Sequence, residues 1–256
     1  MTPPAGSFET GWPSALLDEI AAAGTVAVLT GAGVSAASGI PTFREAQTGL
    51  WTRFRPEDLA TPEAFAANPA RVWQWYQWRR SLIARAEPNG AHRAVARLQR
   101  HLIDCRVITQ NVDGLHERAG ARVSALHGNI WRQRCQRRCG FSETATEPDD
   151  RPEPPPCPAC AAPMRPDVVW FGESLPADVL KAAVTAVEHA EVVLVAGTSG
   201  LVYPAAALPE QALARGRTVV EINPDDTPLS AVATVRCRNA ADAALPALCE
   251  ALALPD

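Results

Sequence analysis

The sequence predicts an α/β protein in which a doubly wound domain, built on a parallel sheet, carries a smaller lobe. Short valine-rich runs with the character of buried strands alternate with amphipathic helical patterns along the chain. A glycine-rich loop follows the first of these runs, and four of the seven cysteines fall in two close pairs. A chain of 256 residues is long enough to bury the substantial core that such a fold needs.

Four apolar runs predict the strands, because each is rich in β-forming residues and stops at a glycine or an amide side chain. They cover residues 26–30, 106–109, 192–196 and 218–222. Helical patterns lie between and around them, at residues 16–23, 69–86, 91–101 and 177–189. Asn68 followed by Pro69 is typical of a helix start, since asparagine caps the first turn and proline fits its first position.

The spacing of the strands predicts two insertions. Residues 31–105 separate the first two strands, too many for one crossover, and the cysteine pairs lie between the second and third. We therefore expect a single domain, residues 1–256, with a Rossmann-like lobe from about 10–45, 100–130 and 166–256. The smaller lobe combines a helical part, about 46–99, and a cysteine-containing part, about 131–165.

Composition excludes several classes of protein. The net charge is −4, whereas a general nucleic-acid binder usually carries a basic surplus, so nucleic acid is not expected as a primary ligand. No run in the sequence reaches the roughly 20 uninterrupted apolar residues that are needed to span a membrane. The N-terminus lacks the basic start and apolar centre of a secretory signal. We therefore expect a cytoplasmic protein in a reducing compartment, whose paired cysteines bind metal.

The glycine loop starts at Gly31 and follows the first strand with the spacing G-x-G-x-x-A. Glycines there allow a tight turn and a close approach to the pyrophosphate of a dinucleotide; a plain strand-to-helix turn is an equally good interpretation. No acidic residue ends a second strand about 20 residues further on, so the usual hydride-transfer arrangement is not expected. Residues 38–44 should end any helix early and form a flexible cover over the ligand.

The two cysteine pairs have the spacing of zinc knuckles. A three-residue gap separates the first pair, a two-residue gap the second, and 17 residues, 140–156, lie between the pairs. Four sulfur ligands leave no open position for water, which indicates a structural rather than a catalytic zinc site. The predicted ligands are Cys135, Cys139, Cys157 and Cys160.

Small polar residues follow three of the predicted strands: residues 110–113, 197–200 and 223–225. Ligands of open α/β sheets bind beyond the carboxyl ends of strands, so these segments are expected to form one site. His127 lies between the two predicted lobes and is followed by Gly128, which favours a position in the cleft.

Six motifs, taken in their order along the chain, resemble those of the sirtuins, the NAD-dependent protein-lysine deacylases. The resemblance runs from about residue 25 to residue 241. It is carried by residues 31–44 (GAGVSAASGIPTFR), 110–113 (QNVD), 126–128 (LHG), the four cysteines, 168–173 (VVWFGE) and 197–199 (GTS).

The resemblance implies that NAD and zinc are the cofactors and that acylated-lysine proteins are the substrates. The acyl oxygen would attack the ribose carbon as nicotinamide leaves, giving free lysine and O-acyl-ADP-ribose. His127 would be the general base, which suits an imidazole because its pKa lies near working pH, and Asn111 and Asp113 would orient the ribose and nicotinamide. Phe43 would shield the intermediate from returning nicotinamide. The implied NAD contacts are Gly31, Ala32, Gly33, Ser35, Gly39, Thr42, Phe43, Arg44, Gln110, Asn111, Val112, Asp113, Gly197, Thr198, Ser199, Asn223, Pro224, Asp225 and Ala241.

The substrate peptide would pair as a strand with residues 168–173, through Val168, Phe171, Gly172 and Glu173. Because almost nothing lies outside the catalytic unit, we expect a monomer.

One helical face suggests the acyl group. Val72, Tyr76, Arg79, Ile83 and Ala86 share it, so Arg79 sits in an apolar stripe, where a guanidinium is costly without an anion. The pair Tyr-x-x-Arg resembles the sirtuin subgroup that removes acidic acyl groups such as succinyl. A forked donor and a hydroxyl suit a carboxylate.

A small residue, Ala46, would leave room for the longer acyl chain. Alternatively, Arg79 pairs with Glu63 or Asp58 and the enzyme is a plain deacetylase. The sequence is also compatible with mono-ADP-ribosyl transfer from the same NAD site, with a non-catalytic zinc module and with an NAD-binding regulator without turnover.

Overall fold

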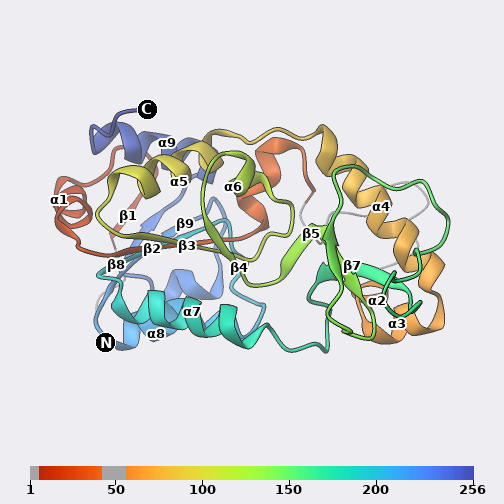
Figure 1. Ribbon diagram of the computed structural model, residues 1–256. Coiled ribbons are helices and arrows are strands. Elements are labelled where there is room, and N and C mark those ends of the chain that lie inside the picture. Colours follow the sequence, from red (N-terminus) through yellow and green to blue (C-terminus); the bar gives the residue numbers. More distant parts are fainter. Residues whose placement is uncertain (1–5, 42–55) are drawn as a thin grey trace.

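The computed structural model describes residues 6–41 and 56–256 and shows a two-lobed molecule (Figure 1). The larger lobe is built on a sheet of seven described strands, all parallel. In order across the sheet they are β1 (Gly6–Phe8), β10 (Val235–Cys237), β9 (Thr218–Ile222), β8 (Val192–Ala196), β2 (Val26–Thr30), β3 (Cys105–Thr109) and β4 (Val123–Ala125).

The four predicted strands are confirmed as β2, β3, β8 and β9. Three of them have the predicted bounds, and β3 begins one residue earlier, at Cys105. The remaining strands β1, β4 and β10 have three residues each, too short to produce a readable pattern, and they extend the sheet toward its two edges.

Helices cover both faces of this sheet, which confirms the doubly wound arrangement (Figure 1). One face packs against α1 (Ser14–Ala22), α5 (Gly90–His101) and α9 (Ala241–Ala251), and the other against α7 (Ala177–His189) and α8 (Ala207–Ala214). The short helix α6 (Leu115–Arg118) follows β3. Because the central strands are buried on both faces, they show continuous apolar runs rather than alternation.

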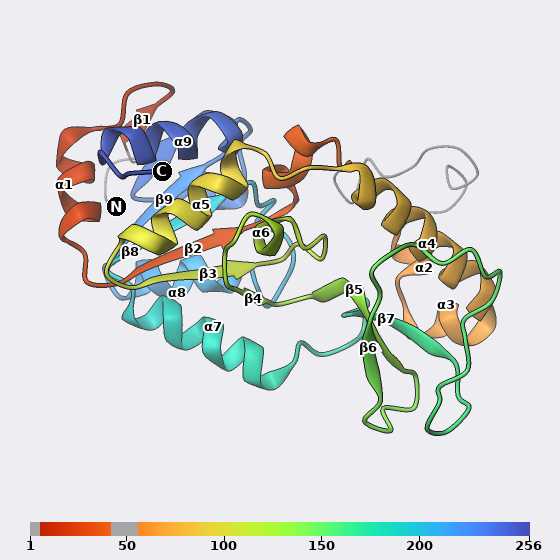
Figure 2. The ribbon, with the colours of Figure 1, turned by 45° about the horizontal axis from the view of Figure 1, so that its top comes forward.

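The smaller lobe contains both insertions. Its helices are α2 (Pro56–Leu59), α3 (Pro62–Ala67) and α4 (Pro69–Arg85). Its antiparallel sheet has the order β6 (Ser142–Thr144), β5 (Gly128–Cys135) and β7 (Met164–Val168) (Figure 2). A mixed aromatic and aliphatic core joins the helices to the sheet, with members Leu59, Phe65, Trp75, Tyr76, Ile130 and Trp170.

Local signals at the start of α4 are confirmed. The Asn68 Oδ1 atom accepts a hydrogen bond from the Arg71 backbone N–H at 2.9 Å, and Pro69 occupies the first helical position. Thr61 caps α3 in the same way, accepting from the Ala64 N–H at 3.1 Å. None of the helices in the described part of the chain is long and apolar enough to cross a membrane.

Candidate active site and metal centre

The glycine loop after β2 lies against the loop after β8. Gly31 and Gly33 donate their N–H groups to Ala196 O at 3.0 Å and Gly197 O at 2.9 Å. A Cβ at Gly31 would stand 2.8 Å from Gly197 O, and a Cβ at Gly33 would stand 2.8 Å from Gly197 Cα. These glycines therefore have a packing reason that the sequence did not reveal: they let two strand-end loops meet.

The helix after the glycine loop ends early, as predicted. It is a short 3-10 segment, η1 (Ala32–Ser38), which Gly39 ends in the left-handed conformation at φ 76°. The predicted cover residues Thr42, Phe43 and Arg44, and the predicted acyl-pocket residue Ala46, lie outside the described residues.

Three predicted site residues meet in one hydrogen-bond network behind the glycine loop. Ser35 Oγ donates to Asp113 Oδ2 at 2.7 Å. Asn111 Nδ2 donates to Gly31 O at 3.0 Å and to Ser35 Oγ at 3.1 Å. The Leu115 N–H donates to Asp113 Oδ1 at 2.8 Å, so the carboxylate is held at both oxygens. The loops after β2 and β3 are thereby locked together.

Sequence reasoning missed two buried histidines that extend this network. His92 Nδ1 accepts from the Asn89 N–H at 3.2 Å, which leaves Nε2–H to donate to Ser35 Oγ at 3.3 Å. His116 Nε2 lies 2.9 Å from Thr30 Oγ1, and the two imidazole rings are 4.8 Å apart. Burial lowers the pKa of both rings, that of His116 to about 3, so both are neutral near pH 7.

The sequence carried only weak signals for these histidines. His92 is the third residue of α5 and completes a capping box with Asn89. His116 closes the polar run that follows β3.

His127 lies between the two lobes, as predicted, after β4 of the large sheet and before β5 of the small one. Its Nδ1 is 3.0 Å from Gln110 O, and since a carbonyl only accepts, Nδ1 carries the proton and Nε2 keeps its lone pair. Burial lowers the pKa of His127, although the Gln110 carbonyl opposes the shift. A neutral imidazole with a free lone pair can act as a general base.

The next residue, Gly128, has φ 82° and a position where a Cβ would stand 2.1 Å from Asp167 O, so only glycine fits. This close approach brings β5 against β7, and the Val169 N–H donates to His127 O at 2.9 Å. The histidine backbone is therefore tied to the segment expected to bind the peptide.

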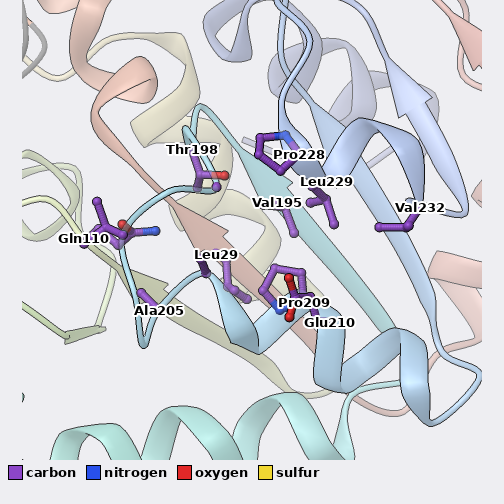
Figure 3. Close-up of a pocket in the computed structure, with 13 residues that line it drawn as sticks. Leu29, Gln110, Val195, Thr198, Ala205, Pro209, Glu210, Pro228, Leu229 and Val232 are labelled. Atoms are coloured by element: carbon purple, nitrogen blue, oxygen red, sulfur yellow. The ribbon is translucent and has the colours of Figure 1, made fainter.

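The loops after β8 and β9 are also joined, because Asn223 Nδ2 donates to Thr198 O at 2.9 Å. Ser199, Pro224 and Asp225 are exposed beside them. Figure 3 shows a pocket at this edge, where Gln110 and Thr198 lie over an apolar floor that includes Val195. Ala241 begins α9 and is buried in the same apolar cluster as Val34 of η1. Gln110, Val112 and Gly197 are half-buried around these loops.

The four predicted cysteines converge at the far end of β5. All four Sγ atoms lie within 4.8 Å of one another, with Cys135 and Cys160 at 3.4 Å and Cys139 and Cys157 at 3.6 Å. A tetrahedral Zn–S distance of about 2.3 Å corresponds to sulfurs about 3.8 Å apart, so the set fits zinc. With no other ligand type in the group, such a site is closed and structural.

The face of α4 that carries Tyr76 and Arg79 is turned inward, and it continues to the C-cap residue Ala86. Val72, Tyr76, Ile83 and Ala86 are buried along it, and Arg79 is half-buried. The Arg79 guanidinium carbon lies 5.1 Å from the centroid of the Trp75 ring and 5.8 Å from that of Tyr76.

The hydroxyl of Tyr76 accepts a hydrogen bond from Trp170 Nε1 at 2.8 Å. Burial lowers the pKa of Arg79, partly offset by Tyr76 and by the Asp113 carboxylate, which places the guanidinium within electrostatic range of the Ser35 network. Burial raises the pKa of Tyr76, so its hydroxyl stays protonated.

Glu173, at the end of the predicted peptide-binding segment, forms a buried ion pair with Arg165 of β7. Arg165 donates to both oxygens of Glu173 at 2.8 and 2.9 Å, and its guanidinium lies over the Trp170 ring. The Trp170 N–H also donates to Glu173, so this carboxylate shapes the turn around Gly172, whose φ is 83°. Val168 is buried at the end of β7, whereas Phe171 is 43% exposed.

Sequence reasoning also missed a second buried cation in this lobe. Arg80 donates to Ile130 O at 2.7 Å and fastens α4 to β5, and burial lowers its pKa to about 10. Neither Arg80 nor Arg165 stands in a recognisable motif, so their roles become visible only with their partners.

The fold and site define a class of α/β protein that has a nucleotide-binding type of site at the carboxyl ends of its strands and a second lobe of zinc-ribbon type. His127 lies where the two lobes join. The sequence pattern of the Sir2 family matches residues 31–204. The chain belongs to the Sir2 family, as the motifs predicted.

Curated relatives cover most of the chain. A Mycobacterium tuberculosis protein named NAD-dependent protein deacylase is 52% identical over 233 residues, 89% of this chain and 97% of its own length. An Aquifex aeolicus protein of the same name is 50% identical over 222 residues, 86% of this chain and 92% of its own.

Solved structures agree with the fold. A Sir2 homologue in complex with NAD matches with a TM-score of 0.92 and 47% identity, covering 97% of this chain and 96% of its own. A Sir2 protein bound to acetylated peptide matches with a TM-score of 0.83 and 30% identity, covering 94% and 98%.

Proposed function

We propose that this Sir2-family protein is an NAD-dependent protein-lysine deacylase that removes acidic acyl groups of the succinyl and malonyl kind as well as acetyl groups. The products are free lysine, nicotinamide and O-acyl-ADP-ribose. The general activity is supported by the two relatives named NAD-dependent protein deacylase, at about half identity over most of the chain, and by similar structures with NAD and with acetylated peptide.

NAD, when bound, supplies the ADP-ribosyl group that receives the acyl group as nicotinamide leaves. The chain's part is to orient it at the carboxyl ends of β2, β3, β8 and β9. Asn111 and Asp113 are suited to hold the ribose and nicotinamide, because Ser35 fixes both side chains. The two joined pairs of loops give the site a rigid floor before any ligand enters.

His127 acts as the general base toward a ribose hydroxyl. The Gln110 carbonyl fixes its tautomer, and the lowered pKa keeps Nε2 unprotonated near pH 7. The main-chain bond between His127 and Val169 keeps the base at a constant position relative to the peptide segment.

The hydrogen bond from Trp170 to Tyr76 carries the acidic-acyl proposal. Because the Tyr76 oxygen accepts the indole N–H, its own proton remains available to a ligand oxygen. The Arg79 guanidinium lies beside the same ring and presents several N–H groups. A hydroxyl donor and a planar cation side by side match a carboxylate, whereas an acetyl group uses neither.

The test compares kcat/KM for one peptide that carries either succinyl-lysine or acetyl-lysine, with and without NAD. Wild type should require NAD and prefer succinyl. Arg79→Met should lose that preference by about 100-fold while it keeps acetyl turnover, since a charge-assisted pair contributes about 3 kcal/mol. Tyr76→Phe should lose a smaller part.

Arg85→Met is the matched control, because this exposed arginine ends the same helix. If Arg79→Met and Arg85→Met give the same succinyl-to-acetyl ratio as wild type, the enzyme is a plain deacetylase. If neither peptide turns over but ADP-ribose appears on protein, the site performs ADP-ribosyl transfer instead.

A further inference from the structure

A buried carboxylate lies under one of the loops expected to hold NAD. Glu221, in β9, is only 3% exposed, and no step proposed above uses it. It follows the apolar residues of a central strand, where a charged side chain is costly unless its oxygens are fully engaged. Its partners therefore indicate what it is for.

Both oxygens of Glu221 bind the hydroxyl groups of a single helix cap. Thr227 Oγ1 donates to Oε1, and Ser230 Oγ donates to Oε2 at 2.6 Å. These two residues form a reciprocal capping box at the start of η3 (Pro228–Ala231): Thr227 Oγ1 accepts from the Leu229 N–H at 3.1 Å, and Ser230 Oγ accepts from the Thr227 N–H at 2.8 Å. The hydroxyl oxygens satisfy the cap, and their protons point to the carboxylate.

The charge of Glu221 is balanced from the neighbouring strand. Arg236 of β10 stands opposite it in register, with Nε 3.6 Å from Oε2. The same guanidinium contacts Asp226, and Arg238 contacts Asp226 at 3.2 Å. The segment from residue 223 to 230 is thus fastened at its middle by Asp226 and at its end by Glu221.

This fastened segment contains Asn223, which the resemblance implies lies near the adenosine of NAD, and Pro224 and Asp225, which are expected to contact NAD. It also supports the other loop at that end of the site. Asn223 binds Thr198 O, and a Cβ at Gly200 would lie 3.5 Å from Pro228 Cδ and 3.8 Å from Thr227 Oγ1. In Figure 3, Pro228 and Leu229 lie beside Thr198 at the pocket.

We propose that Glu221 is a positioning residue for the adenosine end of NAD. Through Thr227 and Ser230 it fixes the loop after β9, and through that loop it fixes the position of residues 197–200. The inference rests on the proposed function, because it assumes that these loops contact NAD. It assigns Glu221 no contact with the acyl-lysine or with the reacting atoms. Losing it should therefore weaken NAD binding and leave the chemical step unchanged.

The experiment measures kcat, KM for NAD and KM for the acyl-peptide in Glu221→Ala, Glu221→Gln and Thr227→Val. Direct titration with ADP-ribose gives a second measure of binding. Glu221→Ala should raise KM for NAD and Kd for ADP-ribose on the order of tenfold, with kcat at saturating NAD and KM for peptide unchanged. Glu221→Gln keeps one acceptor oxygen and should show a smaller increase in the same parameters.

Glu188→Gln is the matched control, since this glutamate makes an exposed pair with Arg215 outside the site. Thermal melting identifies a variant that fails to fold, in which case Thr227→Val decides, because it removes only the hydroxyl. Unchanged KM for NAD in Glu221→Gln and Thr227→Val, or a fall in kcat alone, would overturn the inference. A wild type without NAD-dependent turnover would instead overturn the proposed function.

Discussion

The large lobe and the small lobe are each stabilised by a different kind of interaction. The large lobe has two aliphatic clusters on either side of its sheet, dominated by valine, leucine, isoleucine and alanine. The small lobe has an aromatic core with buried cations at its border, Arg80 and Arg165, and a separate cluster around the cysteines. Hydrophobic burial is non-directional and tolerates small shifts, whereas metal ligands and buried ion pairs require defined geometry.

This difference follows from size. The small sheet has three described strands, and β6 is exposed along its length, so the lobe cannot bury enough apolar surface to stabilise itself. Small domains in this position use metals or other cross-links. Substituting a few polar groups should therefore lower the stability of the small lobe and leave that of the large lobe almost unchanged.

The largest effect should come from zinc. Removing it by a chelator, or by Cys157→Ala, should unfold the cysteine-containing part of the lobe, since structural zinc contributes about 10 kcal/mol or more. Strand β5 runs from the residue after His127 to the ligand Cys135, so loosening it also displaces the base. We expect activity to be lost while the amides of β2, β3 and β8 keep their protection from hydrogen exchange.

Cys249→Ala is the control for this experiment, because Cys249 is buried in the large lobe away from the cysteine group. It should keep zinc content and activity. Equal loss of protection in both sheets of Cys157→Ala would show that the lobes are not independently stabilised.

The second effect concerns Arg165. Replacing it with methionine leaves the Glu173 carboxylate half-buried, with the Trp170 N–H at 3.0 Å and the more distant Arg134 and Arg138, at 3.5 and 3.8 Å, to compensate. We expect the free energy of unfolding of the small lobe to fall by about 3 kcal/mol, read from hydrogen exchange in β5 and β7. Arg165→Met combined with Glu173→Gln should recover part of this loss.

A surface pair gives the contrast for Arg165. Arg215 and Glu188 form an ion pair with both side chains substantially exposed, and Arg215→Met should change stability by less than about 1 kcal/mol. If Arg165→Met has an equally small effect, burial of the ion pair is not what stabilises the small lobe.

The same division explains what could be predicted from the sequence. The central strands were located almost to the residue, because burial on both faces leaves an uninterrupted apolar run between polar ends. The cysteines were assigned because the ligand type and spacing are themselves the signal. Ser35, Asn111 and Asp113 could be placed because each follows a strand.

The partners of buried polar groups could not be predicted, since they lie far apart in the chain. Ser35 meets His92 across 57 positions, and Arg80 meets Ile130 across 50. A single arginine or histidine has no periodicity that marks it as buried. The same holds for Glu221: its place in an apolar strand is visible in the sequence, but its two hydroxyl partners are not.

The large lobe also contains buried polar groups, and the pH dependence of its stability should reveal His116. His116 has a folded pKa of about 3 against about 6.5 in the unfolded chain, because burial disfavours the imidazolium. Between these values the unfolded state binds more protons, so the stabilisation is present above pH 6.5 and is lost as pH falls toward 3. Urea unfolding should show an extra loss of about 1.4 kcal/mol per pH unit in wild type relative to His116→Asn. Parallel curves for the two proteins would mean that His116 is already solvated in the folded state.

The smallest effect lies at the junction of the lobes, in the pH dependence of catalysis. Since burial lowers the pKa of His127, the base stays neutral to lower pH than a free imidazole. The acidic limb of kcat/KM should therefore have its midpoint below about 6.5, with activity lost as pH falls through the folded pKa and the imidazole becomes protonated. The limb should stay in place in His116→Asn, because the Gln110 carbonyl, and not the buried histidine pair, fixes the His127 ring. A midpoint above 6.5 would indicate that the effect of an anion near His127 on its pKa outweighs the effect of burial. The electrostatic environment of the junction would then resemble that of the small lobe, with its charged groups, more than that of the aliphatic sheet.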